Sequence, residues 1–413
     1  MSKRAATSKK EHLRIAVVSD IHAFAKNTPR DKETQTPRPS YLEVASPISD
    51  ITRNPIAGLY DLIQKNSITA DLLLCAGDLG EKSSPIGIKT AWEALHSLGA
   101  RLGAQLTTAT TGNHDLDSRH INNKYDPRGF LMTLTPRYPL GDEGLTDRYW
   151  ARNYVILEGD EYRVVLLNSC GYHSGDESRE ITHGRISEWT LDFLKRDLEA
   201  STPKPINILL CHHHPKRHPE IDYEDYEMMK GGESLLEMLA SGSIGDWLVI
   251  HGHKHYPRID HAAGGNCAPV VFSAGSLCAV LYETIASLVR NQFYIITIPF
   301  ADVSQLGLVG EVMAWDWGEG VGWQPASATM ARGIPHKCGF GMRGPLNPLA
   351  AKVAAQVTQP LVAWNALRTL LPELKYILPR DLSVLEGLLS RDFDLSLVYD
   401  VSGIPFQIGK RTK

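Results

Sequence analysis

The chain has 413 residues, of which 43% are hydrophobic and 22% are charged, and its formal net charge is −4 at pH 7. This is the composition of an ordinary globular protein, long enough for one large domain with an extension or for two domains. It excludes a protein that binds polyanions through its overall charge, although a local basic patch is still allowed.

The N-terminal segment 1–12 is basic, and no apolar core follows it, so we expect a disordered tail rather than a secretory signal. No apolar run reaches membrane-spanning length, and the run 277–289 is interrupted by Glu283. The six cysteines are scattered without a Cys-x-x-Cys pair, and several lie in apolar segments where free thiols pack as small hydrophobic groups. These features predict a cytoplasmic protein without a membrane segment.

The first expected strand is the apolar run 13–19, which ends in Asp20-Ile21-His22. The two-residue period of a strand puts Asp20 and His22 on the same side, where carboxylate and imidazole can hold one ion. The alternative is a strand that merely ends in polar residues. Segment 24–55 is rich in Pro, Thr and Ser, so we expect a surface loop, either a lid over the site or a solvated insertion.

The next elements alternate between helix and strand. Segments 56–66 and 88–101 have helical spacing, segment 70–76 is expected to be a buried strand, and the β-rich segment 105–110 is expected to be another strand. This alternation predicts an α/β layered domain whose ligands follow successive strand ends. The first of these strands runs into Gly77-Asp78, and the two oxygens of Asp78 can bridge two cations.

The second strand delivers the run Gly112-Asn113-His114-Asp115. Asn113 offers a neutral carbonyl oxygen to a metal, and His114 offers an imidazole that can lie beside the metals without binding them. We expect Asp115 to orient that imidazole and set its tautomer.

The second half of the chain carries a histidine-rich pair of strand ends. A hairpin is expected at 153–158 and 162–169, followed by an amphipathic helix at 186–198 with Trp189, Phe193, Leu194 and Leu198 inward. Strand 205–210 ends in Cys211-His212-His213-His214-Pro215, and strand 246–250 ends in His251-Gly252-His253-Lys254-His255. A solvated loop could explain three consecutive histidines, but five at two strand ends favour a metal site.

These motifs in this order resemble those of the calcineurin-like metallophosphoesterase superfamily: Asp-x-His, Gly-Asp, Gly-Asn-His-Asp, a strand-end His, then Gly-His-x-His. The resemblance spans residues 13–280. It implies a four-layer αββα sandwich of two mixed sheets, with a dinuclear metal site in the cleft between them.

The resemblance also implies a ligand set, in which Asp78 bridges the two ions. One ion would be held by Asp20, His22, Asp78 and His255, and the other by Asp78, Asn113, His213 and His253. The family's strand-end histidine usually lies two residues before a proline, which selects His213 with His212 as runner-up. His114 resembles the family's non-ligand histidine, which contacts the phosphate, and we take His114 with Asp115 as the catalytic residues.

Mixed imidazole and carboxylate ligands suit divalent Mn, Fe, Zn, Ni or Co, and we expect Mn to serve best in vitro. Two such ions lower the pKa of a bridging water, so the expected reaction is attack of this hydroxide on phosphorus while His114 assists the leaving group. The segment from Gly77 to Lys82 lacks the arginine pattern of Ser/Thr phosphatases, and Glu81 stands where purple acid phosphatases have a tyrosine.

What remains is the phosphodiesterase group, whose members act on cyclic nucleotides, glycerophosphodiesters or, in Mre11-like nucleases, nucleic acid. We therefore expect a small diester or a nucleotide as substrate, with nucleic acid as the alternative. A non-catalytic scaffold of the same fold is the competing class, and the complete ligand set argues against it.

The remaining segments complete the chain. Strands are expected at 270–276 and 291–299, completing the second sheet, and at 306–317, with Trp315, Trp317 and Trp323 in the core rather than forming a platform for a base. Segment 331–348 is rich in Gly and Pro. Helices are expected at 361–378, interrupted at Pro372, and at 381–389, and a strand at 393–399.

The expected organisation is a tail at 1–12, the catalytic domain at 13–300 with its insertion at 24–55, and a C-terminal extension at 301–413. The extension should be β-rich and then helical, ending as a small α/β appendage. We expect the extension to bind a protein partner or to form a dimer contact.

Overall fold

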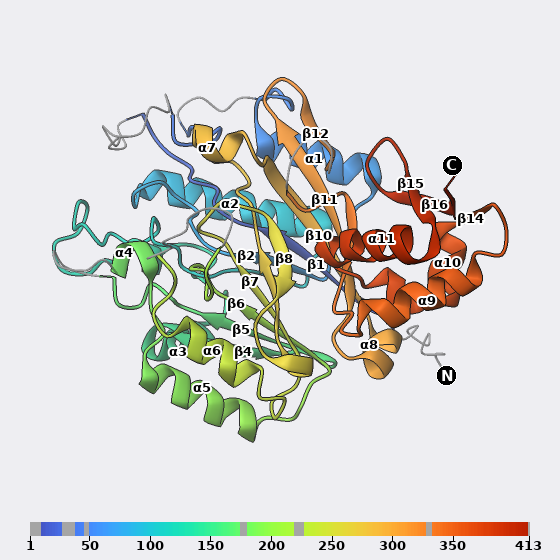
Figure 1. The fold of residues 1–413 in the computed structure, drawn as a ribbon. Coiled ribbons are helices and arrows are strands. Elements are labelled where there is room, and N and C mark those ends of the chain that lie inside the picture. The colour runs from blue at the N-terminus through green and yellow to red at the C-terminus, as the bar shows by residue number, and fades with distance from the viewer. Residues whose placement is uncertain are drawn as a thin grey trace, which may run out of the picture.

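Two mixed β-sheets stack face to face in this computed structural model, which describes residues 10–26, 38–44, 49–173, 180–218, 227–327 and 333–411 (Figure 1). The first sheet runs in the order β12-β11-β10-β1-β2-β3, with β13 also paired to β11. Its strands are β1 (His12–Val18), β2 (Leu72–Cys75), β3 (Leu106–Ala109), β10 (Asn291–Pro299), β11 (Gly310–Gly318), β12 (Gly322–Pro325) and β13 (Lys337–Phe340). β1, β2 and β3 are parallel neighbours.

The second sheet runs in the order β4-β5-β6-β7-β9-β8. Its strands are β4 (Tyr154–Glu158), β5 (Tyr162–Leu167), β6 (Ile206–Leu210), β7 (Trp247–His251), β8 (Arg258–His261) and β9 (Val270–Ser273). β5, β6, β7 and β9 are parallel, so their carboxyl ends lie at one edge of the sheet.

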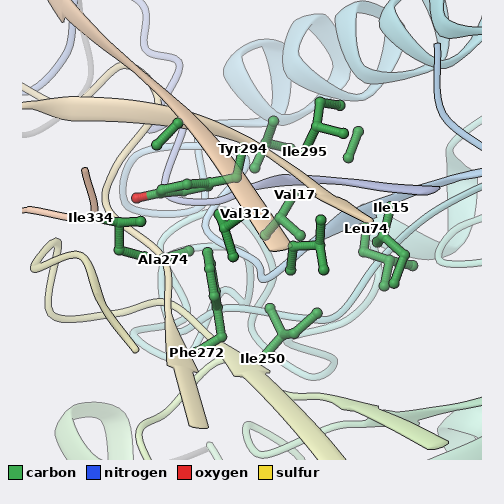
Figure 2. Close-up of a cluster of buried hydrophobic side chains, with 14 of the residues drawn as sticks. Ile15, Val17, Leu74, Ile250, Phe272, Ala274, Tyr294, Ile295, Val312 and Ile334 are labelled. Atoms are coloured by element: carbon green, nitrogen blue, oxygen red, sulfur yellow. The ribbon is translucent and has the colours of Figure 1, made fainter. Parts of the chain in front are cut away.

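Alternating side chains of each strand enter two different apolar layers. In β5, Val164 and Leu166 belong to the core between the sheets, whereas Val165 and Leu167 pack under the helices on the outer face. Figure 2 shows the inner layer, where Val17 of the first sheet lies across from Ile250 and Phe272 of the second. Strands buried on both faces explain the continuous apolar runs in the sequence.

Helices cover the outer faces of both sheets (Figure 1). The longer helices of the domain are α1 (Pro55–Asn66), α2 (Pro85–Leu102), α3 (Glu143–Arg152), α5 (Glu188–Ala200) and α6 (Gly232–Leu239); α4 (Glu180–His183), α7 (Glu283–Ala286) and α8 (Phe300–Leu306) are short. α2 begins where the Ser84 side chain accepts the backbone N–H of Gly87 and ends at Gly103, whose φ is 71°. The four-layer αββα sandwich is thereby confirmed.

Two expectations about individual elements are wrong. β10 belongs to the first sheet, because it pairs antiparallel with β1 from His12 to Val17. In α5, Leu194 and Leu198 are buried, but Trp189 is 73% exposed and Phe193 is 39% exposed. Trp189 and Phe193 are four residues apart and share a different stripe of the helix, and only one stripe can face the sheet.

The C-terminal extension begins later than expected. β11 to β13 are part of the first sheet, so the boundary expected at residue 300 falls between two paired strands. The appendage itself contains α9 (Leu346–Gln356), α10 (Trp364–Leu370), α11 (Pro379–Phe393) and a sheet of β14 (Leu361–Ala363), β16 (Pro405–Lys410) and β15 (Leu395–Tyr399). Pro372 opens a 3-10 turn there. Its apolar residues, such as Leu367 and Leu385, join the main core.

The three tryptophans near β11, Trp315, Trp317 and Trp323, are buried, which confirms core packing. Of the loop at 24–55, the structure describes residues 24–26, 38–44 and 49–55, and the rest lies outside the described residues, as does tail segment 1–9. Ser40 donates a hydrogen bond to the carbonyl of Ile21, so this part of the loop lies beside the end of β1. None of the described helices is both long and apolar enough to cross a membrane.

Candidate metal centre

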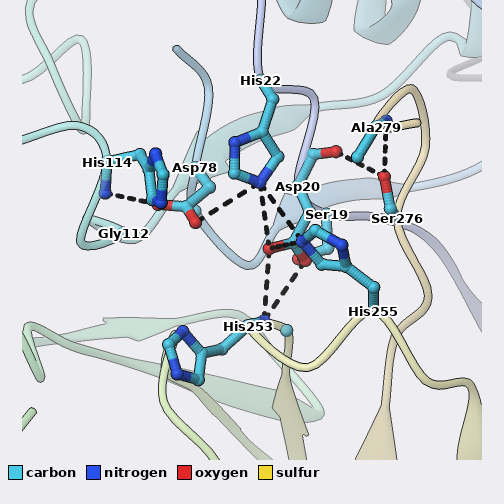
Figure 3. A network of polar contacts seen from close by, with 12 residues as sticks. Ser19, Asp20, His22, Asp78, Gly112, His114, His253, His255, Ser276 and Ala279 are labelled. Atoms are coloured by element: carbon cyan, nitrogen blue, oxygen red, sulfur yellow. Dashed lines mark hydrogen bonds and ion pairs between the residues drawn. The ribbon is translucent and has the colours of Figure 1, made fainter. Parts of the chain in front are cut away.

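Polar side chains from five strand ends meet at the carboxyl edges of the two sheets (Figure 3). β1, β2 and β3 of the first sheet lead to Asp20 and His22, to Asp78, and to Asn113; β6 and β7 of the second lead to His212, His253 and His255. The sheets face each other, so these ends form one buried cluster. This is the usual location of a ligand site in parallel sheets.

The backbone at this cluster is strained. Asp20, His22, Asp78, His253 and His255 all have φ between 51° and 75°, the left-handed region that side chains other than glycine rarely adopt. Such strain costs about 1–3 kcal/mol per residue and persists where surrounding structure and function demand it. All five residues were expected ligands, so the strain coincides with the site.

Two motif glycines allow the strand ends to approach closely. A Cβ on Gly112 would lie 2.1 Å from Oδ1 of Asp78, and a Cβ on Gly252 would lie 2.0 Å from Oγ of Ser19. Both distances are far below a normal contact. The glycines in Gly-Asn-His and Gly-His-x-His are therefore required by the spacing of the site.

The first ligand group consists of Asp20, His22 and His255. Oδ1 of the fully buried Asp20 lies 3.3 Å from Nε2 of His255, and the Nε2 atoms of His22 and His255 are 3.2 Å apart. Ser19 Oγ donates to Oδ2 of Asp20. Three donor atoms of these residues thus lie within 4.8 Å of one another.

The second group consists of Asn113, His212 and His253. Oδ1 of Asn113 lies 2.9 Å from Nε2 of His212 and 3.1 Å from Nδ1 of His253. Asp78 lies between the two groups, with Oδ2 3.3 Å from Nε2 of His212 and 3.6 Å from Nε2 of His22. This is the position that a bridging carboxylate needs.

Of the two candidate strand-end histidines, His212 is the one placed at Asp78. Its Nδ1 donates to the carbonyl of Ala76 over 2.7 Å, which leaves Nε2 as the ligand atom. His213 points elsewhere, with Nδ1 2.9 Å from Oγ of Ser169, although one of its nitrogens lies within 4.8 Å of donors on His212 and His253. The family spacing, two residues before Pro215, predicts His213 as the ligand. In this chain the histidine at Asp78 lies three residues before the proline, because the run contains three histidines.

The expected partner of His114 is also different. The carboxylate of Asp115 accepts hydrogen bonds from the backbone N–H groups of Asp78, Leu79, Gly80 and Gly112. The carboxylate that reaches the His114 ring is that of Glu81, with Oε2 3.1 Å from Nδ1. The predicted orienting role of Asp115 is therefore wrong, and Glu81 was missed because its three-residue offset from Asp78 carries no signal in one sequence.

Burial and charge shift several pKa values at the cluster. Burial lowers the pKa of His114, but the Glu81 and Asp78 carboxylates outweigh it and raise the value to about 9. Burial raises the pKa of Asp115 to about 7, with Asp78 acting in the same direction. Burial also raises the pKa of Asp78, but the imidazoles of His212 and His114 dominate and hold it well below its usual value.

The donor set fits two divalent transition-metal ions. Within the described part of the chain, Asp20, His22 and His255 form one group of mutually close donors, and Asp20, Asp78 and His212 form another. His253 faces Asn113 with Nδ1, while its Nε2 is buried without a hydrogen-bond partner among the described residues. Carboxylate, amide and imidazole ligands together suit such ions.

Fold and site define an α/β sandwich with a buried candidate metal centre, and comparison with known proteins specifies the class. A family model for calcineurin-like phosphoesterases matches residues 13–257, more than half of the chain. The chain belongs to this family, whose members are hydrolases that act on phosphate esters.

Solved structures resemble this chain at low identity. A purple acid phosphatase from yellow lupin (Lupinus luteus) seeds is 14% identical with a TM-score of 0.45, and the match covers 74% of this chain and 52% of that one. A 5′-nucleotidase precursor from Thermus thermophilus is 14% identical with a TM-score of 0.34, covering 72% and 52%. The chain therefore spans about half the length of these two proteins. No curated protein matches the chain.

Proposed function

We propose that the protein is a phosphodiesterase that uses two divalent transition-metal ions, with Mn²⁺ the ion of choice in vitro. The observation that carries this proposal is the placement of Asp78. Its Oδ2 lies between Nε2 of His212 and Nε2 of His22, and so between two complete ligand groups. A carboxylate shared by two such groups is expected for a dinuclear site.

Seven side chains make up the proposed ligand set. Asp20, His22, Asp78 and His255 would hold one ion; Asp78, Asn113, His212 and His253 would hold the other. When bound, the two ions would supply a nucleophile from water at neutral pH and offset charge on the phosphoryl oxygens. The completeness of this set argues against a non-catalytic scaffold.

His114 is the proposed proton donor to the leaving group. Its backbone N–H donates to Oδ1 of Asp78 over 2.8 Å, which fixes the residue beside the centre. Its side chain is 23% exposed, against 6% for His22 and 13% for His255, so a substrate can reach it. With its pKa raised to about 9 by Glu81 and Asp78 against the effect of burial, the ring carries a proton at neutral pH.

The choice of a diester rests on charge. A phosphodiester carries one negative charge, whereas a monoester carries up to two and calls for additional cations. Among the described residues, no hydrogen bond or ion pair joins an arginine to the ligand residues or to His114, although Arg119 acts on His114 electrostatically. A site whose positive charge comes mainly from the two metal ions suits a diester.

The compartment is proposed to be the cytoplasm. All six cysteines lie in the described residues and are free, which suits a reducing environment.

The test is hydrolysis of bis-p-nitrophenyl phosphate and p-nitrophenyl phosphate by metal-stripped protein reloaded with Mn²⁺, beside His114→Ala. We expect Mn-dependent cleavage that favours the diester and falls by roughly 10²–10⁴-fold in His114→Ala with metal content retained. Preference for the monoester would overturn the proposed specificity. Cleavage of single-stranded DNA with a steep salt dependence would instead establish an Mre11-like nuclease.

A further inference from the structure

A second cluster of metal-binding side chains lies next to the centre and takes no part in the proposed function. It contains Cys170, His173 and His213, whose donor atoms all lie within 4.8 Å of one another. Cys170 and His173 follow strand β5, and His213 follows the neighbouring parallel strand β6. All three side chains are at most 2% exposed. The cluster is therefore a closed site that the topology assembles from adjacent strand ends.

Three of the four imidazole nitrogens of this cluster lack a hydrogen-bond partner among the described residues. Neither ring nitrogen of His173 has a hydrogen-bond partner among the described residues, and Nε2 of His213 has none either. A backbone group of Glu180 approaches the His173 ring without reaching hydrogen-bond geometry. Native proteins leave few buried polar atoms unpaired, so three in one place require an explanation. A cation bound beside Cys170 would provide one for the His173 nitrogen that faces it, whereas His213 faces Cys170 with Nδ1 and its Nε2 would stay unpaired.

The spacing suits a tetrahedral ion. Sγ of Cys170 lies 3.9 Å from Nδ1 of His213. For a tetrahedral zinc ion with ordinary Zn–S and Zn–N bonds, the two donors would be about 3.5 Å apart, which a small side-chain adjustment achieves.

The orientation of His213 fits this use. Ser169 Oγ accepts the backbone N–H of His213 over 3.2 Å, so its own hydrogen can be donated to Nδ1 at 2.9 Å. Nδ1 then carries a lone pair on the side that faces Cys170. A cation would compete with the Ser169 hydroxyl group for that lone pair. Nε2 of His213 would remain on the side of the ring that faces His212 and His253.

We propose that Cys170, His173 and His213 bind a third cation, of the thiophilic class represented by Zn²⁺, separate from the pair at Asp78. Thiolate and imidazole donors select zinc-like ions over Mn²⁺ or Mg²⁺. On binding, the Cys170 thiol, which now donates to the carbonyl of Thr111 over 3.1 Å, gives its proton to solvent and its sulfur bonds to the ion. The fourth position is open to water or to His183, which is buried and close enough to His173 and His213 to act on both rings electrostatically.

The third ion would stabilise the side of the dinuclear centre that contains His253. The rings of His213 and His253 have centroids 4.6 Å apart, so fixing His213 also fixes the surface against which the proposed ligand His253 packs. The proposal does not depend on the phosphodiesterase activity, because it concerns donors outside that ligand set.

The test uses the full metal-free chain titrated with Co²⁺ and followed by near-ultraviolet absorption. The ligands proposed for the dinuclear centre include no cysteine, so a thiolate-to-cobalt charge-transfer band reports the third site alone. We expect the band in the native protein, its loss in Cys170→Ser, and its retention in Cys211→Ser. Cys211 is a matched control because it is equally buried, beside the same histidines, and outside the cluster.

Zinc analysis provides the second readout. Native protein should bind three equivalents of Zn²⁺, and Cys170→Ser should bind two. Should Cys170→Ser fail to fold, His173→Gln keeps the thiol and should weaken Co²⁺ binding at the thiolate band by roughly tenfold or more. Absence of the band in native protein at saturating Co²⁺, or its survival in Cys170→Ser, would overturn the proposal. Loss of esterase activity alone would not bear on it.

Discussion

Glu81 contacts the His114 imidazole, with Oε2 3.1 Å from Nδ1, and the same oxygen lies 2.9 Å from Nδ1 of His22. One carboxylate thus orients a proposed metal ligand and the proposed proton donor together. Both rings are held by their Nδ1 side, which leaves their Nε2 atoms for the ion and the substrate. Glu81 is 8% exposed, so this contact is shielded from solvent.

The first prediction is that Glu81→Gln lowers kcat by roughly 10–100-fold at saturating Mn²⁺. The neutral amide removes the charge that raises the pKa of His114, so less of the ring is protonated at neutral pH. The loss should be larger for a diester with a phenyl leaving group than for one with p-nitrophenyl, because the poorer leaving group depends more strongly on receiving a proton. Steady-state kinetics on the two diesters provide the measurement.

Glu319→Gln is the control for this change, since Glu319 is a surface carboxylate paired with Arg38 over 2.7 Å. It should leave both rates unaltered. Equal losses for the two leaving groups in Glu81→Gln would mean that Glu81 acts through His22 and the metal alone.

The second prediction concerns Asp115, which holds the loop that carries Asp78. Four backbone N–H groups donate to its buried carboxylate, at 2.7 to 3.2 Å. Asp115→Ala leaves these donors unsatisfied, so the free energy of unfolding should fall by roughly 3–5 kcal/mol. Urea unfolding monitored by circular dichroism measures this loss.

Asp50→Ala is a suitable comparison, because Asp50 also accepts a backbone N–H, from Thr52 over 2.8 Å, but at an exposed site. Its effect should stay within about 1 kcal/mol. An Asp115→Ala variant that is as stable as Asp50→Ala yet inactive would restore the catalytic role expected from the sequence.

Much of the site was predictable because its strands are buried on both faces. Continuous apolar runs such as 70–76 end abruptly in polar residues, and parallel strands bring those ends together. The identity of Asp20, His22, Asp78 and Asn113 as site residues follows from that pattern. The direction in which each side-chain atom points does not follow from the pattern, because that direction depends on tertiary packing.

The sequence could not distinguish His212 from His213, since adjacent residues after a strand have no fixed direction. The prediction that β10 belongs to the second sheet is wrong for a similar reason. β10 pairs with β1, which is far away in the sequence, and nothing local in 291–299 records its partner. Several elements were missed altogether, among them α3, whose sequence is mostly polar, and β16, which contains Pro405 and Gly409. Propensity is weak for both.

The third prediction separates the two histidines. His212→Ala should lose Mn²⁺ from the dinuclear centre and reduce diester hydrolysis at least about a hundredfold, because Nε2 of His212 is aimed at Asp78 and Asn113. His213→Ala should keep the Mn²⁺ pair and most of the activity. Metal analysis after gel filtration, with activity on the same samples, provides the measurement. The opposite ranking would restore the ligand chosen from the spacing to Pro215.

The last prediction tests which stripe of α5 faces the second sheet. Leu194 is fully buried among the outer-layer residues, whereas Trp189, five positions earlier, is 73% exposed. Leu194→Ala should lower the free energy of unfolding by about 2–5 kcal/mol through lost burial and a cavity. Trp189→Ala should change it by no more than about 0.5 kcal/mol, although tryptophan is the larger side chain. Urea unfolding of the two variants side by side gives the comparison. A larger loss for Trp189→Ala would show that α5 is rotated so that the tryptophan stripe, as first expected from the sequence, packs on the sheet.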